Sequence, residues 1–179
     1  DVHNPATHAL LARTPTATPD EVNAAVDAAR RAQPAWERTP AIQRAGHLRA
    51  IAAKLRQHKE HLAETITREQ GKILGLARVE VDFTADYIDY MAEWARRIEG
   101  EVITSDRAGE SIFLTRRPIG VTVGILPWNF PFFLIARKMA PALVAGNTIV
   151  IKSSEETPLN AFDFTELLAE YGLPKGVFN

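Results

Sequence analysis

The spacing of apolar residues changes along the chain, from a helical period in the first half to short β-branched runs in the second. A helix is predicted to begin at Thr18-Pro19-Asp20-Glu21, where a capping box coincides with a proline at the first helical position. A second helix is predicted from Thr39-Pro40 to Gly71, with one continuous apolar face. Residues 1–100 are therefore expected to be mainly helical.

A third helix is predicted from Leu76 to Gly100, because large residues recur there at gaps of three and four. We expect this face to pack into the core; its members are Val79, Phe83, Tyr87, Tyr90, Met91 and Trp94. The opposite side carries Asp82, Asp86 and Asp89, which could form a metal site but are more typical of a solvated acidic face. We assign no chemistry to these carboxylates.

A hairpin outside the main sheet is predicted in residues 101–117. The turn residues Asp106-Arg107-Ala108-Gly109 separate the β-branched run 101–104 from the apolar run 111–115. Such an arm exposes strand edges, whose unpaired backbone groups can form hydrogen bonds with a strand of another chain. The segment is therefore a candidate subunit contact, and a plain solvated hairpin is an equally good interpretation.

A strand–helix–strand unit follows and determines the fold class. Val121 to Leu126 reads as a strand, Pro131 to Ala145 as a helix and Thr148 to Lys152 as a second strand, before a last helix that opens at Thr157-Pro158 and ends at Gly172. Crossovers of this kind are almost always right-handed and make the strands parallel. The chain is therefore predicted to be an α/β protein.

The carboxyl ends of the two parallel strands should line one crevice, which is where ligands bind in such sheets. Pro127-Trp128-Asn129 follows the first strand, and Lys152-Ser153-Ser154-Glu155 closes the second. Trp128 offers an indole plane to a ligand or packs as a buried aromatic. Asn129 can donate into the crevice and stabilise an oxyanion, or it can cap the helix that starts near Pro131. Both alternatives stay open for each residue.

Charged residues near the crevice suggest what it binds. Lys152 and Glu155 could grip the vicinal hydroxyls of a ribose, or they could simply be solvated. A carboxylate at Glu155 would repel a 2′-phosphate, which favours NAD over NADP. Arg137 could reach a hydroxyl or carboxylate of a small polar substrate, or lie on the surface. The glycine signature G-x-G-x-x-G is missing, so no phosphate cradle is predicted in this sequence.

Composition narrows the class of protein. The 179 residues are 46% hydrophobic and 24% charged with a net charge of −1, which does not suit a nucleic-acid-binding surface. The longest apolar run, 132–144, is interrupted by Arg137, Lys138 and Pro141, so no membrane span is expected and we predict a soluble, cytoplasmic protein. There is no cysteine, which excludes disulfides, thiolate metal sites and a cysteine nucleophile supplied by these residues. The chain starts at Asp1, and we interpret it as a piece of a longer protein.

Several motifs together resemble the aldehyde dehydrogenase family. The sequence Pro127-Trp128-Asn129-Phe130-Pro131 is followed by Met139 to Leu143 and by Ala145-Gly146-Asn147-Thr148. Asn4-Pro5-Ala6-Thr7 and the end of the chain from Gly172 to Asn179 also fall in the order that the family shows. Two further runs, 83–94 and 132–138, most resemble bacterial lactaldehyde and glycolaldehyde dehydrogenases.

The resemblance implies the amino-terminal part of a Rossmann-type cofactor domain, with a helical lead-in in residues 1–100, a hairpin arm for homo-oligomerisation in 101–117, and the first strand–helix–strand–helix of the NAD-binding sheet in 118–179. It implies that Asn129 donates into the oxyanion hole. It also implies that Ile125, Leu126, Pro127 and Trp128 line the cofactor site and that Lys152 and Glu155 hold the adenosine ribose. We include Ser153 and Ser154 among the predicted cofactor-binding residues because they lie in the turn between Lys152 and Glu155. The family commonly has a proline where this chain has Ser153, which loosens the turn at that point.

By the same resemblance the nucleophilic cysteine, the general-base glutamate and the pyrophosphate turn lie beyond Asn179. The expected function is the front portion of an NAD-dependent dehydrogenase that oxidises a small aldehyde such as lactaldehyde or glycolaldehyde through a thiohemiacetal, hydride transfer and thioester hydrolysis. The alternative is an inactive remnant that acts as a binding or assembly module. Calorimetry with NAD separates the two, because only a retained half-site would bind the dinucleotide.

The isolated 179-residue polypeptide is expected to show no dehydrogenase activity, because it holds no thiol to form the covalent intermediate. The measurement is NADH fluorescence after mixing the purified polypeptide with glycolaldehyde and NAD. NADH formation above a protein-free control would contradict the expectation.

Overall fold

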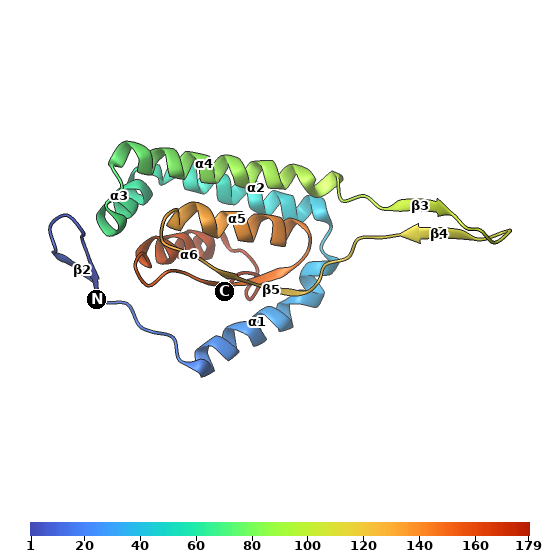
Figure 1. Ribbon diagram of the computed structural model, residues 1–179, viewed down its shortest axis with the longest axis horizontal. Helices are drawn as coiled ribbons and strands as arrows, with labels where there is room; N and C mark the ends of the chain where they lie inside the picture. Colours follow the sequence, from blue (N-terminus) through green and yellow to red (C-terminus); the bar gives the residue numbers. More distant parts are fainter.

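The computed structural model describes all of residues 1–179 and places helices on both sides of a small parallel sheet. Figure 1 shows α2, α3 and α4 as an outer helical layer, α5 and α6 between that layer and the strands β5 and β6, and α1 on the far side. The elements are β1 (Val2–His3), β2 (Leu10–Ala12), α1 (Pro19–Arg38), α2 (Ala41–Gln57), α3 (Lys59–Gln70), α4 (Leu74–Ala92), the 3₁₀ helix η1 (Glu93–Arg96), β3 (Glu101–Thr104), β4 (Ser111–Leu114), β5 (Val121–Ile125), α5 (Pro131–Val144), β6 (Thr148–Lys152) and α6 (Leu159–Tyr171).

The predicted α/β class is confirmed by the sheet. Strands β5 and β6 pair in parallel, from Val121 opposite Thr148 to Ile125 opposite Lys152, and α5 crosses between them. Near the end of the chain Phe178 forms a parallel bridge with Ile149, so β6 has neighbours on both sides. The predicted strands and the helix between them are therefore correct.

The single helix predicted between Thr39-Pro40 and Gly71 is wrong, because the structure breaks it at His58. That residue has φ −101° and ψ 15°, outside the helical region, and it ends α2 and precedes α3. Leu55 and Leu62 on either side of the break are both fully buried. The apolar spacing persists because both helices face one core, and spacing alone does not report a change of helix direction.

The prediction for the third helix is wrong about much of its buried face, although Tyr87 and Met91 are partly buried and pack against the core as expected. The core-facing apolar positions of α4 are mostly small, namely Ala77, Val81, Ala85, Ile88 and Ala92. The expected packing residues Val79, Phe83 and Tyr90 are 58%, 51% and 49% exposed. Small side chains occupy the buried face because they allow α4 to approach α2 and α5 closely, and close approach gives denser packing.

The helix also stops earlier than predicted, at Ala92, where η1 takes over. Its acidic side is paired with the neighbouring helices rather than free. Lys59 lies 2.5 Å from Asp82, and Arg56 lies 2.8 Å from both Asp86 and Asp89. These ion pairs are at least partly exposed, so each is expected to contribute little to stability.

The hairpin prediction is confirmed, with Glu101 opposite Leu114 and Thr104 opposite Ser111 in antiparallel register. Figure 1 shows β3 and β4 extending away from the body of the protein as an arm. Every residue of the two strands is exposed, including Val102 at 72% and Phe113 at 70%. A second hairpin, β1 with β2 at the amino-terminal end, was not predicted.

Helix α1 reaches the sheet from the side opposite α5. Its Gln33 donates to the backbone oxygen of Gly146 at 3.0 Å and accepts from the backbone nitrogen of Thr148 at 2.8 Å. Trp36 donates from its indole nitrogen to the backbone oxygen of Leu143 at 3.1 Å. These bonds hold α1 at the amino-terminal end of β6. None of the helices combines the length and the apolar character of a membrane span.

Two glycine-to-alanine substitutions are expected to change stability in opposite directions. Gly146 has φ +91° and an added Cβ would lie 2.9 Å from Pro118, so Gly146→Ala should lower the free energy of unfolding by about 1 to 3 kcal/mol. Gly46 lies on the exposed side of α2 with nothing within 4 Å, so Gly46→Ala should raise it by about 0.5 to 1 kcal/mol. Urea unfolding measures both, and equal effects at the two sites would contradict the assigned backbone geometry.

Candidate functional site

Both polar turns leave the sheet at the same edge, as predicted. Ile125 is the register partner of Lys152, and the backbone nitrogen of Leu126 donates to the backbone oxygen of Lys152 at 3.0 Å. The Ile125 side chain is 74% exposed at this edge, whereas Leu126 is buried in the core. Only the backbone of Leu126 is therefore available to a ligand. We call this edge, with residues 125–129 and 152–155, the rim.

The first turn of the rim presents its side chains to solvent. Trp128 is 56% exposed rather than buried. Asn129 is also exposed, and its hydrogen bonds are made through its backbone oxygen. The N-cap of α5 is Phe130, which makes no side-chain capping bond. The capping alternative for Asn129 is therefore not what the structure shows, and its carboxamide remains available for other contacts.

The second turn carries an ion pair. Lys152 Nζ lies 2.6 Å from Glu155 Oε2, and both side chains are more than half exposed. The hydrogen bond from Lys152 lowers the pKa of Glu155, so its carboxylate form is favoured. Ser154 is buried and accepts from the backbone nitrogen of Glu156 at 3.2 Å, which shapes the turn, while Ser153 is partly buried.

A groove of about 440 Å³ joins the two turns. It is lined by Pro5, Glu69, Gln70, Trp128, Ser154, Glu155, Glu156 and Thr157. Two of its polar atoms, Gln70 Oε1 and Thr157 Oγ1, are buried and have no hydrogen-bond partner. The structure thus brings Trp128 and Glu155 together on one concave surface whose lining is mostly polar.

Two buried glutamates behind the rim were missed by sequence reasoning. Glu69, at the end of α3, accepts from the backbone nitrogens of Leu159 at 2.7 Å and Asn160 at 3.0 Å. Glu80, on α4, accepts from the backbone nitrogens of Phe132 at 3.0 Å and Phe133 at 3.1 Å. Each carboxylate thus caps a helix that follows one rim turn.

Burial raises the pKa of Glu69, and its hydrogen bonds from Asn160 and Leu159 oppose that rise. Glu69 is 3% exposed and Glu80 is 2% exposed. The available signal in the sequence was a glutamate on the apolar side of a predicted helix, because charged residues are rarely buried unless they have partners.

Two further side chains, one at the end of α3 and one in the segment after it, tie these elements to the first turn. Gln70 Nε2 donates to the backbone oxygens of Trp128 at 3.0 Å and Asn129 at 2.8 Å. Lys72 pairs with Glu80, donates to the backbone oxygen of Asn129 at 3.3 Å, and lies 4.2 Å from the ring centre of Phe130. We call Gln70, Lys72 and Glu80 the turn clamp.

Arg137 is exposed on α5 and does not line the rim groove. Burial raises the pKa of Tyr87 on α4, and the positive charge of Arg137 opposes that rise. The aromatic rings there are in contact, with Phe133 4.5 Å from Phe83 and 5.4 Å from Tyr87 between ring centres. Arg137 therefore lies apart from the rim residues that are predicted to bind the cofactor.

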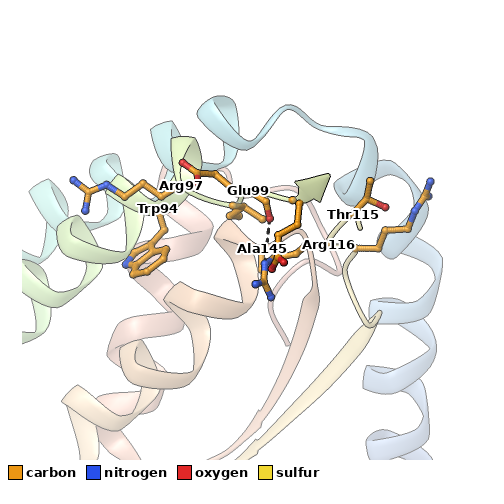
Figure 2. Close-up of a pocket in the computed structure, with 10 residues that line it drawn as sticks. Trp94, Arg97, Glu99, Thr115, Arg116 and Ala145 are labelled. Atoms are coloured by element: carbon orange, nitrogen blue, oxygen red, sulfur yellow. Dashed lines mark hydrogen bonds between the residues drawn. The ribbon is translucent and has the colours of Figure 1, made fainter. Parts of the chain in front are cut away.

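A larger cavity of about 910 Å³ lies at the base of the hairpin arm rather than at the rim. Figure 2 shows Trp94, Arg97, Thr115 and Arg116 around it, with Arg116 donating to the backbone oxygen of Glu99 at 3.1 Å. Ala145, which follows α5, also lines it. The cavity is thus at the opposite end of α5 from the rim, and it contains none of the predicted site residues.

A parallel strand–helix–strand unit with polar groups beyond both strand ends is the arrangement of α/β proteins that bind ligands at the sheet edge. The sequence model of the aldehyde dehydrogenase family matches residues 1–179. The chain therefore belongs to the aldehyde dehydrogenase family, whose members are oxidoreductases.

Individual relatives agree with this assignment. The lactaldehyde dehydrogenase of Escherichia coli is 62% identical over 179 residues, which cover 100% of this chain and 37% of the relative. The NADP(+) succinate-semialdehyde dehydrogenase of the same organism is 43% identical, with 100% and 37% covered. A crystal structure of E. coli lactaldehyde dehydrogenase matches with a TM-score of 0.99 and 62% identity over 100% of this chain and 38% of that chain. The chain thus spans little more than a third of the length of these relatives.

Removing the lysine of the exposed ion pair should change the titration of its partner. Lys152→Met is expected to raise the pKa of Glu155 toward its ordinary value, because the ammonium that stabilises the carboxylate is lost. The measurement is a pH titration followed by the side-chain carboxyl ¹³C resonance. Lys175→Met, an exposed lysine outside the rim, is the control and should leave the pKa of Glu155 unchanged. Equal values in all three proteins would show that the pair does not form in solution.

Proposed function

We propose that this chain forms the front portion of an NAD-dependent aldehyde dehydrogenase that oxidises a small hydroxyaldehyde, such as lactaldehyde or glycolaldehyde, to the acid. The observation that carries the proposal is the shared rim, where Trp128, Asn129, Lys152 and Glu155 lie at the ends of neighbouring parallel strands. The 62% identity to a lactaldehyde dehydrogenase over the whole chain supports the choice of substrate class.

The rim residues fit a dinucleotide. Lys152 and Glu155 offer an ammonium and a carboxylate within 2.6 Å of each other, a donor and an acceptor suited to the two hydroxyls of a ribose. Trp128 adds an exposed indole beside the groove, and Ile125 adds an exposed apolar side chain. The backbone from Leu126 to Pro127 completes this surface. When bound, the nicotinamide supplies the hydride acceptor of the reaction.

NAD rather than NADP is the proposed cofactor. The lowered pKa of Glu155 keeps a negative charge where a 2′-phosphate would lie if the pair holds the adenosine ribose. Lys152 offsets part of that charge but is already hydrogen-bonded to Glu155. Repulsion between the carboxylate and the phosphate therefore favours the cofactor without the phosphate.

Asn129 is the proposed oxyanion donor. Its carboxamide is exposed, and the amides of the adjacent helix are capped by Glu80 instead, so its N–H groups are available to substrate. The thiol nucleophile and the general base would come from outside residues 1–179, since the chain has no cysteine.

Arg137 is the proposed contact to substrate oxygen atoms. It is exposed beside the partly exposed rings of Phe83, Tyr87 and Phe133, so one cation and several aromatic walls share that surface of α4 and α5. A hydroxyaldehyde has one polar group for such a cation besides its reactive carbonyl. A contact between Arg137 and this second polar group would favour a small hydroxylated substrate over a purely aliphatic one.

The hairpin arm is the proposed site of homo-oligomerisation. An isolated two-stranded hairpin is marginally stable in water, and this one exposes Val102, Phe113 and Leu114. Covering these side chains against a second copy of the chain would remove apolar surface from water. The same exposure supports the second candidate function, an assembly module without activity, which predicts self-association without binding of NAD.

The proposal is tested on the full-length enzyme that contains residues 1–179. Glu155→Ala is expected to raise KM for NAD about 10-fold, or roughly 1.4 kcal/mol, because the ribose hydroxyls lose a charged acceptor. The same variant should show a smaller preference for NAD over NADP, because the carboxylate that repels the 2′-phosphate is removed. The assay is NADH formation from lactaldehyde. Glu170→Ala, an exposed glutamate on α6, is the control and should behave as the wild type. An unchanged KM for NAD in Glu155→Ala would remove the cofactor role assigned to this residue.

A further inference from the structure

We propose that Gln70 and Lys72, supported by Glu80, are positioning residues that hold the turn bearing Asn129 in its productive geometry. The proposal rests on the proposed function, in which the Asn129 carboxamide donates to an oxyanion. Sequence reasoning assigned no role to these three residues. The turn clamp bonds to the backbone of the turn and leaves the Asn129 side chain free.

Gln70 holds the two successive peptide groups on either side of the Asn129 Cα. Its amide nitrogen donates to the backbone oxygens of Trp128 and Asn129, at 3.0 and 2.8 Å. The orientation of the amide is determined, because a reversed Gln70 would set its oxygen against two carbonyl oxygens. In this orientation Gln70 Oε1 is buried and has no hydrogen-bond partner in the chain, which costs free energy. A cost of that kind is expected where the geometry of the turn matters.

Lys72 provides a second hydrogen bond to the backbone oxygen of Asn129, which also accepts from Gln70. Its ammonium donates to the backbone oxygen of Asn129 at 3.3 Å and lies 4.2 Å from the ring centre of Phe130. The Lys72 side chain is only 13% exposed and pairs with Glu80, whose side chain is 1% exposed. A buried ion pair of this kind holds its position well, because the movement of either charged group would leave the other one buried without a partner.

Glu80 provides the helix cap that the turn itself does not provide. It accepts from Phe132 and Phe133, two of the amides that α5 leaves without intrahelical partners. In many helices the N-cap residue would accept from these amides with its own side chain, but here that residue is Phe130, which has no polar group. Because Glu80 accepts from them instead, no capping bond is needed from the turn, and the Asn129 carboxamide stays free while the backbone of Asn129 is held.

The consequence is a held backbone with a free side chain. Pro127 and Pro131 further restrict the turn at both ends, since proline fixes φ. Electrostatic stabilisation of a transition state requires donors that are already in place, and a displacement of about 1 Å can lower a rate by as much as 100-fold. The turn clamp therefore should affect kcat more than substrate binding.

The chain contains a matched glutamine for comparison. Gln33 also ties two backbone groups together, Gly146 and Thr148, but at the other end of the strand–helix–strand unit. Gln33→Met and Gln70→Met each remove two hydrogen bonds from a partly buried side chain. The two variants should lose similar thermal stability, and only a positioning role separates their kinetics.

The experiment compares Gln70→Met, Gln33→Met, Lys72→Met and Lys72→Arg in the full-length enzyme. Gln70→Met is expected to lower kcat for lactaldehyde about 10-fold with little change in KM for the aldehyde, less than the roughly 100-fold or greater loss on deleting an oxyanion donor. Gln33→Met should keep the wild-type kcat. Lys72→Met should also lower kcat, and Lys72→Arg should restore part of it, because the cation over Phe130 is kept.

Hydrogen–deuterium exchange of residues 128–133 provides a readout that does not depend on activity. Faster exchange in Gln70→Met and Lys72→Met, but not in Gln33→Met, is the expected result. Wild-type kcat in Gln70→Met, with the same loss of stability as Gln33→Met, would overturn the proposal and leave the turn clamp a purely structural role. If the wild-type enzyme oxidises no aldehyde, the proposed function fails, and unchanged exchange in the turn would then overturn the positioning role as well.

Discussion

Buried carboxylates at the amino-terminal ends of α5 and α6 are the constraint on which the arrangement of the rim depends. A helix begins with backbone N–H groups that have no intrahelical partner, and leaving them unpaired inside a protein costs free energy. Glu80 accepts from the first amides of α5, and Glu69 does the same for α6. Each of these helices follows a strand end, so the two carboxylates also fix where the rim turns lie.

This capping from outside explains why the rim side chains face solvent. Because Glu80 caps α5 from α4, the helix takes no capping bond from its own turn, and the Asn129 carboxamide is left free; Trp128 is exposed beside it. Two apolar surfaces outside the rim also remain exposed, at Val123 on β5 and at Phe113 on the hairpin arm. Under the proposed function, the rest of the enzyme would cover the first and another subunit would cover the second.

The parts of the fold that were predicted correctly have strong local signals. The capping box at Thr18, the proline that opens α5 at Pro131 and the turn at 106–109 each act over a few residues. The errors arose where a local pattern had several tertiary solutions. The apolar spacing did not report the break at His58, and aromatic bulk on α4 did not identify the buried face, because only close packing between helices favours the small residues.

For the candidate site, the sequence by itself determined which residues stand at the two strand ends, since strand, turn and helix signals follow one another directly from Val121 to Glu155. It also determined that no thiol is available within the chain. Only the tertiary structure decided that Asn129 is free and Arg137 lies apart from the rim. That decision depends on contacts between residues 52 and 91 positions apart, such as Glu80 with Phe132 and Glu69 with Asn160, and pairing over such separations leaves no periodic trace in the sequence.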